Sequence, residues 1–223
     1  MMSHRQLKGV YLVPRGRFDA IATKAIVPES VYGEELVREG NDTYRIWDPS
    51  KSKLGAGIIK GLSQIGIKPG SKVLYLGCAS GTTVSHVSDL VGPDGFVYAL
   101  DFAPRVMRDF MFVVEKRKNI LPIMDDANHP EHYKHFVPEV NVVFQDVAQR
   151  NQVEIFTKNC EAFLKIGDFG VLALKSRSVD VTKNPNVVFD EVTTQLSKKF
   201  VIVDQRKLDP FEKDHMLFVV KKK

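Results

Sequence analysis

Between residues 73 and 220 the chain alternates short runs of β-branched and aliphatic residues with stretches of helical periodicity. Strands separated by helices predict an α/β fold, in which a parallel sheet carries helices on both faces. The expected strands are Val73–Leu76, Phe96–Leu100, Ile120–Met124, Val140–Phe144, Gly170–Lys175, Phe200–Val203 and His215–Val220. Only residues 204 to 214 join the last two strands, which is too short for a parallel crossover, so these two should form an antiparallel hairpin.

The predicted helices fill the intervals between these strands. They span Thr82–Val91, Pro104–Lys118, Pro130–Val137, Asn151–Leu164 and Asn186–Lys199. A further helix should precede the first strand, because apolar residues recur at helical spacing from Leu54 to Ile65 behind a Ser52 N-cap. Gly66 and the Pro69-Gly70 pair should end that helix.

The first 51 residues have a different pattern from the rest. Gly, Pro and Asn-Asp interrupt short β-branched and aromatic segments at Val10–Val13, Ala25–Val27 and Tyr44–Trp47. This pattern predicts a small antiparallel β region at residues 1–51, followed by a Rossmann-like domain at residues 52–223.

Composition narrows the class of protein. The chain has 223 residues, of which 43% are hydrophobic and 26% charged, and no apolar run reaches the ~18 residues of a membrane span. The first residues lack the apolar segment of a signal peptide, so we expect an intracellular protein. Cys78 and Cys160 have no metal-ligand spacing and should be reduced thiols. Lys and Arg exceed Asp and Glu by 32 to 27, which permits RNA binding without requiring it.

The segment KVLYLGCASGTTVSH, residues 72–86, is a strand, a glycine turn and a helix start. Gly77 and Gly81 are four residues apart, which fits neither the dinucleotide fingerprint nor the P-loop. The helix that starts at Thr82 offers free N–H groups to one carboxylate. Asp101 ends the next strand and can accept both hydroxyls of a ribose, and the third strand leads to Asp125-Asp126, which could accept from an adenine amino group. Together these anchors favour S-adenosylmethionine.

Three histidines lie close together in HPEHYKH, residues 129–135. His132 and His135 could share a helix face, but no cysteine and no clear third ligand complete a zinc site. We therefore expect a surface helix and no metal here.

Six collinear segments closely resemble the fibrillarin family: YRIWDPSKSKLGAGI, VLYLGCASGTTVSHVSDLVGPDGFVYALDF, DDANHP, QDVAQRNQ, LALKSRSVDVTKNP and PFEKDH. The resemblance covers the chain from about Val10 onward. It implies the seven-stranded sheet of S-adenosylmethionine-dependent methyltransferases, with the last strand antiparallel. The chain is most similar to archaeal-type members, which are cytoplasmic; a eukaryotic member trimmed of its Arg/Gly-rich extension would be nucleolar.

The resemblance also implies a cofactor site. Thr82 and Thr83 would line the methionine portion, Asp101 would hold the ribose, and Phe102 would lie against the adenine. The full set of implied cofactor-binding residues is Gly77, Ala79, Gly81, Thr82, Thr83, Asp101, Phe102, Asp126, Ala127, Asp146, Val147, Ala148 and Gln149. The sequence departs from the family at Cys78, where a smaller residue is usual, and at Gly55 and Gly57, in a helix that is usually alanine-rich. Each glycine should cost that helix about 1 kcal/mol.

The implied catalytic residues are Lys53, Asp146, Lys175 and His215. Lys175 would hydrogen-bond the 2′-hydroxyl of a ribose and accept its proton, while Asp146 orients Lys175 and His215 positions the set or relays a proton. A lysine acts as a base only when burial or a neighbouring cation, here Lys53, favours its neutral form.

Three functions follow from the sequence. The first is a guided RNA ribose 2′-O-methyltransferase, acting on rRNA or tRNA with a Nop-family scaffold protein, a kink-turn-binding protein and a box C/D guide RNA. The second is a protein methyltransferase acting on glutamine, and the third is a non-catalytic subunit of the ribonucleoprotein. A lysine–aspartate–lysine–histidine set suits a hydroxyl nucleophile better than an amide, which favours the first.

Overall fold

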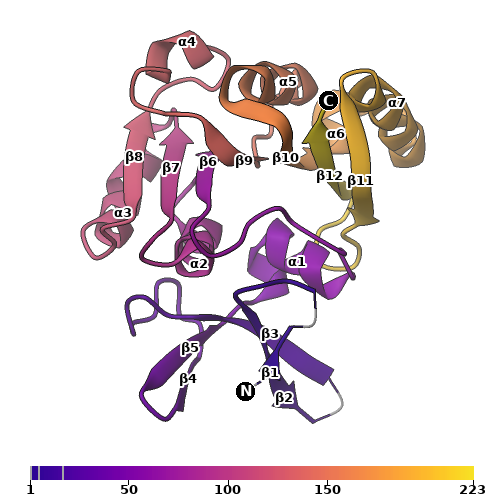
Figure 1. Ribbon diagram of the computed structural model, residues 1–223. Helices are drawn as coiled ribbons and strands as arrows, with labels where there is room; N and C mark the ends of the chain where they lie inside the picture. The colour runs from indigo at the N-terminus through magenta and orange to yellow at the C-terminus, as the bar shows by residue number, and fades with distance from the viewer. Residues whose placement is uncertain (1, 5, 17) are drawn as a thin grey trace.

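The computed structural model describes residues 2–4, 6–16 and 18–223, and within them the chain forms two β-sheets (Figure 1). The small sheet is antiparallel, with the spatial order β1 (Met2–Ser3), β2 (Val10–Arg15), β3 (Phe18–Lys24), β5 (Asp42–Ile46) and β4 (Leu36–Glu39). The large sheet has the spatial order β11 (Phe200–Lys207), β12 (His215–Lys222), β10 (Leu164–Lys175), β9 (Val140–Gln145), β6 (Lys72–Leu76), β7 (Phe96–Asp101) and β8 (Ile120–Met124).

Strand direction in the large sheet follows the prediction. Strands β8, β7, β6, β9 and β10 are parallel, and β12 lies antiparallel between β10 and β11. The last two strands therefore form the predicted hairpin. This confirms the fold class: an α/β, Rossmann-like sheet whose last strand is antiparallel, preceded by a small β region.

Helices cover both faces of the large sheet (Figure 1). They are η1 (Pro49–Lys51), α1 (Lys53–Ile59), α2 (Thr82–Val91), α3 (Pro104–Val114), α4 (Pro130–Tyr133), α5 (Gln152–Phe163), α6 (Ser176–Val179) and α7 (Pro185–Ser197). We call the side covered by α1, α2 and α3 the α2 face and the side covered by α4, α5 and α7 the α5 face. In β6, Val73 and Tyr75 pack on the α2 face whereas Leu74 and Leu76 pack on the α5 face, as the two-residue period of a strand requires.

The helix before the first strand is shorter than predicted. It ends at Ile59 because Gly61 adopts a left-handed conformation (φ +85°), so Gly66 and Pro69-Gly70 do not terminate it. Leu62 and Ile65 are buried outside any helix, which explains why their spacing was misleading. The glycines of this helix fit close packing: a Cβ at position 57 would lie 2.6 Å from a methyl group of Leu217.

The predicted strand Ala25–Val27 is wrong, because β3 ends at Lys24. The backbone N–H of Ile26 donates to the carboxylate of Asp89 (3.1 Å), which takes it out of a strand ladder. Elsewhere the element type is as predicted and the bounds move: β10 begins at Leu164 rather than Gly170, and β11 runs on to Lys207. Five short elements were not predicted: the strands β1, β3 and β4 of the small sheet and the helices η1 and α6.

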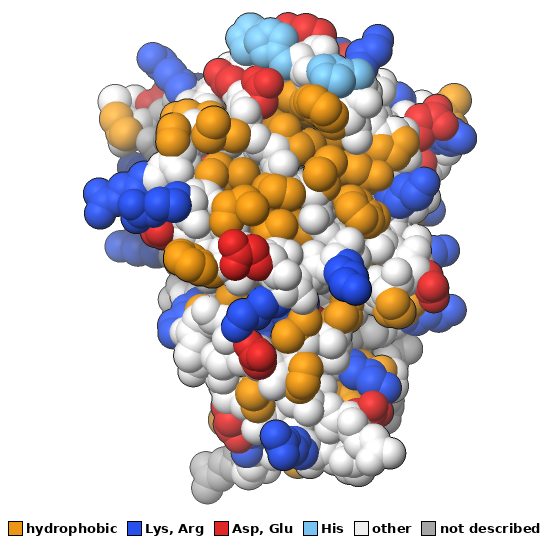
Figure 2. Space-filling model, turned by 90° about the vertical axis from the view of Figure 1, so that its left-hand side faces the viewer, with side chains coloured by type: hydrophobic (Ala, Val, Ile, Leu, Met, Phe, Trp, Pro, Cys, Tyr) orange, Lys and Arg blue, Asp and Glu red, His pale blue; other side chains and the backbone are white. Residues whose placement is uncertain are grey.

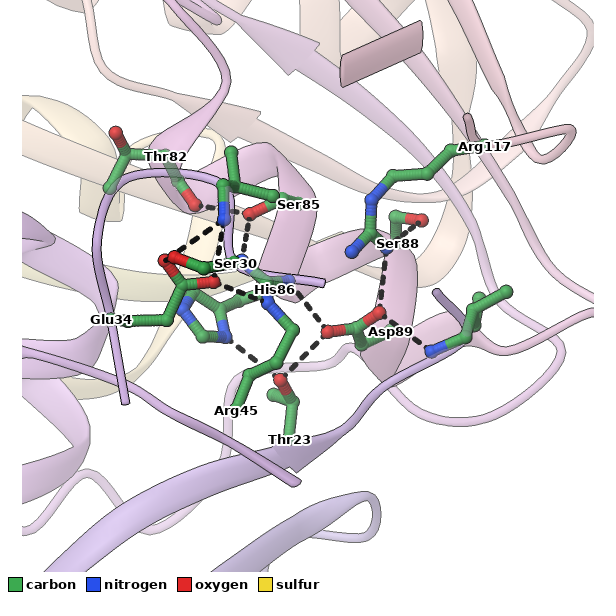
Figure 3. A network of polar contacts seen from close by, with 12 residues as sticks. Thr23, Ser30, Glu34, Arg45, Thr82, Ser85, His86, Ser88, Asp89 and Arg117 are labelled. Carbon is green, nitrogen blue, oxygen red and sulfur yellow. Dashed lines mark hydrogen bonds and ion pairs between the residues drawn. The ribbon is translucent and has the colours of Figure 1, made fainter. Parts of the chain in front are cut away.

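A buried ion network joins the small sheet to α2 (Figure 3). Arg45 of β5 donates to Glu34 (Nε–Oε1 2.6 Å) and to Asp89 of α2 (Nη1–Oδ2 2.7 Å), and Arg117 donates to the other oxygen of Asp89 (2.6 Å). These four side chains are at most 1% exposed. Two cations balance two anions, as buried charges require.

His86 sits beside this network as a neutral ring. The hydroxyl of Thr23 donates to Asp89 (2.9 Å), so it must accept the hydrogen bond from His86 Nδ1 (2.8 Å). The other ring nitrogen then accepts from the Tyr32 hydroxyl (2.8 Å). The ring also stacks on Trp47, with centroids 4.7 Å apart.

The stability of the fold should depend on His86 protonation. Burial, together with the nearby Arg45 and Arg117, holds the pKa of His86 well below its ordinary value of 6.5. The unfolded chain binds a proton below that pH and the folded chain does not, so the free energy of unfolding should fall on acidification, by up to about 1.4 kcal/mol per pH unit. Urea unfolding between about pH 7.5 and pH 5.5 measures this.

Two variants separate this group from the other histidines. A His86→Phe chain should be less stable but should lose most of the pH dependence, whereas exposed His135→Gln should keep it. Equal stability of the wild-type chain at both ends of this pH range would contradict the assignment.

The part of the chain that the structure describes contains no helix long and apolar enough to cross a membrane.

Candidate active site and cofactor cavity

Three of the predicted catalytic residues emerge side by side at one edge of the large sheet. Asp146 follows the last residue of β9, Lys175 ends β10, and His215 begins the reversed strand β12. These strands are neighbours in the sheet. Alternation also fixes the side they occupy, because the residues two positions away in each strand belong to the core on the α2 face: Phe144, Ala173 and Leu217.

The fourth residue, Lys53, reaches the same edge from the first position of α1, which packs on the α2 face. Its ammonium lies 3.0 and 3.1 Å from the two carboxylate oxygens of Asp146. Both side chains are about one-fifth exposed (22% and 20%), so this pair is partly shielded from water. In the structure Asp146 pairs with Lys53, where the sequence analysis expected it to orient Lys175.

A hydrogen bond from α2 fixes the start of α1. Ser52 caps the helix by accepting from the N–H of Gly55 (3.2 Å), and it also accepts from the Thr83 hydroxyl (3.0 Å). Both Ser52 and Thr83 are buried. The glycine turn and Lys53 are therefore mechanically linked through Thr83, a role that its position in the sequence does not suggest.

Lys175 and His215 are directly opposite each other in the antiparallel pair of β10 and β12. The N–H and C=O of Lys175 both bond to Gln152, and the C=O of His215 accepts from Leu208. Their backbones do not bond each other, so this is the type of cross-strand pair in which side chains approach most closely. The Lys175 side chain is exposed, and its ammonium has no hydrogen-bond or ion-pair partner among the described residues.

His215 is buried and its ring orientation is fixed. Its Nδ1 lies 2.7 Å from the carbonyl oxygen of Lys213, which can only accept, so this nitrogen carries the hydrogen. Nε2 is then left as an acceptor in the neutral ring. The carboxylate of Glu212 lies 3.8 Å away.

A cavity of about 290 Å³ lies beside this edge and shares Asp146 with it. It is lined by Gly77, Ala79, Leu100, Asp101, Phe102, Ala127, Asp146, Val147, Ala148 and Gln149. All of these except Leu100 are among the residues predicted to bind the cofactor. The cavity thus brings together segments that follow β6, β7, β8 and β9.

Asp101 is held in place at the cavity wall. One carboxylate oxygen accepts from the N–H of Ala79 in the glycine turn (3.0 Å) and the other from the N–H of Ala103 (3.1 Å). Gly77 lets the turn approach the opposite wall, because a Cβ at this position (φ +82°) would lie 2.4 Å from the carbonyl oxygen of Asp146. Here glycine is required by the contact between the two walls.

Four residues predicted to bind the cofactor do not line this cavity: Gly81, Thr82, Thr83 and Asp126. Gly81 makes room for α3, since a Cβ there would lie 2.7 Å from the ring of Phe110. One oxygen of Asp126 accepts from the backbone and side-chain amides of Asn128 (both 2.9 Å), and these bonds lower the pKa of its carboxyl group. Asn128, which the sequence analysis did not single out, also donates to Gln149 (2.9 Å).

The cysteines lie in the core. Cys78 and Cys160 are buried free thiols, and burial raises the pKa of both. The Cys78 sulfur lies 3.7 Å from that of Met107 in α3, so this departure from the family affects helix packing and not the cavity wall.

The histidine-rich segment forms the short surface helix α4, with exposed side chains of His129, Glu131 and His132. His129 contacts Glu131 (3.0 Å), His132 contacts Asp125 (3.2 Å), and the two imidazole rings stack. His135 lies outside α4, which ends at Tyr133, and its ring packs against Phe136, so it does not share a helix face with His132. The side chains of His129, Glu131 and His132 are all more than half exposed. The hydrogen-bonding groups of His129 and Glu131 pair with each other, and that of His132 pairs with Asp125.

A larger hollow of about 810 Å³ lies between the small sheet, the 32–35 segment and Ile59 of α1. Its charged residues are of mixed sign, Arg15 and Lys51 with Asp19, Glu34, Glu35 and Asp48. None of the predicted site residues lines it. Despite its smaller size, the cavity at Asp146 is the better candidate, because it adjoins the lysines and the histidine.

Exposed apolar side chains lie on the face formed by α3, β8 and α4 (Figure 2). They include Phe102, which is 64% exposed and lines the cavity, Met124 of the edge strand β8 (61%) and Phe136 (57%). Exposed apolar surface of this kind commonly marks a contact site for another molecule.

Comparison with known proteins decides the family. The family model described as fibrillarin matches residues 1–223. The chain belongs to the fibrillarin family. It is 52% identical over 216 residues to the fibrillarin-like rRNA/tRNA 2′-O-methyltransferase of Thermococcus gammatolerans, an alignment covering 96% of each chain.

Solved fibrillarin structures superpose closely on this chain. Aeropyrum pernix fibrillarin, in complex with natively bound S-adenosyl-L-methionine, is 43% identical with a TM-score of 0.90, covering 98% of this chain and 96% of its own. Fibrillarin from a fibrillarin/Nop5p complex is 38% identical with a TM-score of 0.87, covering 97% of this chain and 98% of its own.

Proposed function

We propose that this fibrillarin-family chain is an S-adenosylmethionine-dependent RNA ribose 2′-O-methyltransferase that modifies rRNA and tRNA. It would be the catalytic subunit of a box C/D guide-RNA ribonucleoprotein. The observation that carries the proposal is the position of Asp146, which lines the cavity and also pairs with Lys53 at the edge that holds Lys175 and His215. A cofactor in the cavity and a ribose at this edge would meet at Asp146.

The cavity residues fit the proposed cofactor. Asp101 would accept from the ribose hydroxyls, and the exposed ring of Phe102 offers a flat apolar surface for the adenine. Ala127 would present backbone to the adenine edge, and residues 146–149 would face the methionine part. Gly81, Thr82, Thr83 and Asp126 lie outside the cavity wall and would act through the turn and loop they hold.

S-adenosylmethionine, when bound, supplies a methyl group on a sulfonium. The 2′-hydroxyl must lose its proton as its oxygen gains the methyl carbon, and Lys175 would take that proton. Lys175 is exposed in the free chain, so the water exclusion that favours a neutral amine would come with the docked RNA. The Lys53–Asp146 pair would hold the reacting edge in position.

The cofactor assignment can be tested on the isolated chain by calorimetry. S-adenosylmethionine should bind with 1:1 stoichiometry, and Asp101→Ala should weaken binding about 10- to 100-fold, the value of hydrogen bonds to one charged group. Asp94→Ala, a change at the opposite end of β7, is the matched control and should bind normally. Binding of NAD or ATP in place of S-adenosylmethionine would contradict the assignment.

The partners would be a Nop-family scaffold protein, a kink-turn-binding protein and the guide RNA. The relative solved with Nop5p supports the first of these. The modest net charge of +5 supports a chain that leaves base recognition to a guide, and the apolar face around Phe102 suits a protein that works in an assembly.

A further inference from the structure

At the catalytic edge of the sheet, strand β10 extends beyond its parallel neighbour β9. The pairing of β9 with β10 ends at Leu172 opposite Gln145, whereas β10 continues to Lys175. After Gln145 the chain leaves the sheet as the loop 146–151, which carries the cavity wall. The backbone of Lys175 therefore has no strand beside it on this side to pair with its N–H and C=O groups.

The side chain of Gln152 takes the place of the missing strand. Its Oε1 accepts from the N–H of Lys175, and its Nε2 donates to the C=O of Lys175, both at 3.1 Å. One amide group thus makes both bonds that a neighbouring strand would have made. On its other side Lys175 is paired with His215 of β12, so its backbone is fixed by Gln152 on one side and by β12 on the other.

Gln152 is itself firmly held. It is 0% exposed and is the first residue of α5, and its carbonyl oxygen accepts from the side chain of Gln145, the last residue of β9 (2.6 Å). Its N–H donates to the carbonyl of Gln149 in the cavity wall (3.3 Å). Gln152 consequently connects the loop that lines the cavity to the backbone of Lys175.

We propose that Gln152 is a positioning residue for methyl transfer: it fixes the direction in which Lys175 projects and couples that direction to the cofactor-binding loop. This inference rests on the proposed function. It concerns the geometry of Lys175 at the reacting ribose, so it predicts a loss in kcat without a matching loss in cofactor affinity.

Two substitutions test the role. Gln152→Met keeps the size and removes both hydrogen bonds. Gln152→Glu keeps the acceptor for the Lys175 N–H but, when ionised, cannot donate to the Lys175 carbonyl. A protonated glutamic acid restores that donor, so the ratio of variant to wild-type activity should rise as the pH is lowered. Thr157→Val is the matched control, because it removes a side-chain hydrogen bond (to Val153, 2.8 Å) on the same helix.

The assay uses the complex reconstituted with scaffold, kink-turn-binding protein, guide and target RNA. Gln152→Met should lower kcat by about 10- to 100-fold, the scale of a small misplacement of a reacting group, while the Kd for S-adenosylmethionine stays within about twofold. Thr157→Val should turn over normally. Normal kcat for Gln152→Met, or a pH-independent activity ratio for Gln152→Glu, would overturn the role.

A measurement on the wild-type chain does not depend on the variants folding. The Lys175 amide should be protected from hydrogen exchange to the same extent as the paired residues of β10, and fast exchange would overturn the inference. Failure of the proposed function is distinguishable, because the wild-type complex itself would then be inactive.

Discussion

Lys175→Ala should reduce methyl transfer by the reconstituted complex about 100- to 10,000-fold, the contribution of a general base. Lys175 ends β10 opposite His215, at the edge where the Asp146–Lys53 pair adjoins the cavity. Its side chain does not line the cavity, so cofactor affinity should be nearly unchanged. Rate measurements beside a calorimetric titration with S-adenosylmethionine separate the two effects.

Lys175→Arg distinguishes a base from a positive charge. Guanidinium keeps its proton under working conditions, so this variant should fail as well. Asp146→Ala differs from both, because Asp146 belongs to the cavity wall and to the pair with Lys53, and it should lower activity and cofactor affinity together. Near-normal turnover by Lys175→Arg would show that the residue supplies charge, and normal turnover by Lys175→Ala would remove it from the mechanism.

Asp89→Ala should produce the largest loss of stability, about 3–5 kcal/mol, because it leaves buried cations uncompensated. Asp89 accepts from Arg45, Arg117, Thr23 and the backbone of Ile26, and its side chain is 0% exposed. The small sheet should loosen from α2 as a result (Figure 3). Chemical denaturation of the isolated chain measures the difference.

Asp109→Ala is the matched control, because it removes an exposed aspartate that also pairs with an arginine, Arg108. Surface pairs of this kind contribute little, so its stability should change by less than about 1 kcal/mol. If Asp89→Ala lowered the free energy of unfolding by as little as this control, the network would not stabilise the contact between the small sheet and α2.

The large sheet was predictable because its signals are redundant. The inner strands β6, β9 and the second half of β10 are runs of buried apolar residues, helical segments separate the strands from β6 to β11, and the short link from β11 to β12 dictates the reversed strand. The small sheet was less predictable, because β3 (FDAIATK) has only Ile21 as a large buried apolar residue and its charged neighbours obscure the alternation. The apolar segment Ala25–Val27 has a stronger strand pattern than β3. It forms no strand, because the N–H of Ile26 donates to the carboxylate of Asp89.

Site residues that stand at the ends of strands could be predicted from the sequence. Site residues that act through tertiary packing could not. Asp101, Asp146 and Lys175 stand at carboxyl ends of strands, which the strand pattern locates. Thr83 does not line the cavity, and its hydroxyl donates to Ser52 instead. Gln152, which the sequence does not single out, donates to the backbone of Lys175. Both contacts join segments that are far apart in the chain, so the sequence pattern does not reveal them. The one available signal for Gln152 was its position just after the QDVAQ loop, where a polar residue begins a helix that must be buried.

The position of the transferred methyl group tests directly whether this chain is a ribose 2′-O-methyltransferase. Target RNA should be incubated with labelled S-adenosylmethionine, guide RNA, scaffold and kink-turn-binding protein, with the wild-type chain or with Lys175→Ala, and the product nucleotide mapped. We expect one methyl group on the 2′-oxygen of the nucleotide selected by the guide, almost none with Lys175→Ala, and little with the isolated chain on bare RNA. A methyl group on a base or on a glutamine side chain, or efficient methylation of free RNA by the chain alone, would contradict this expectation.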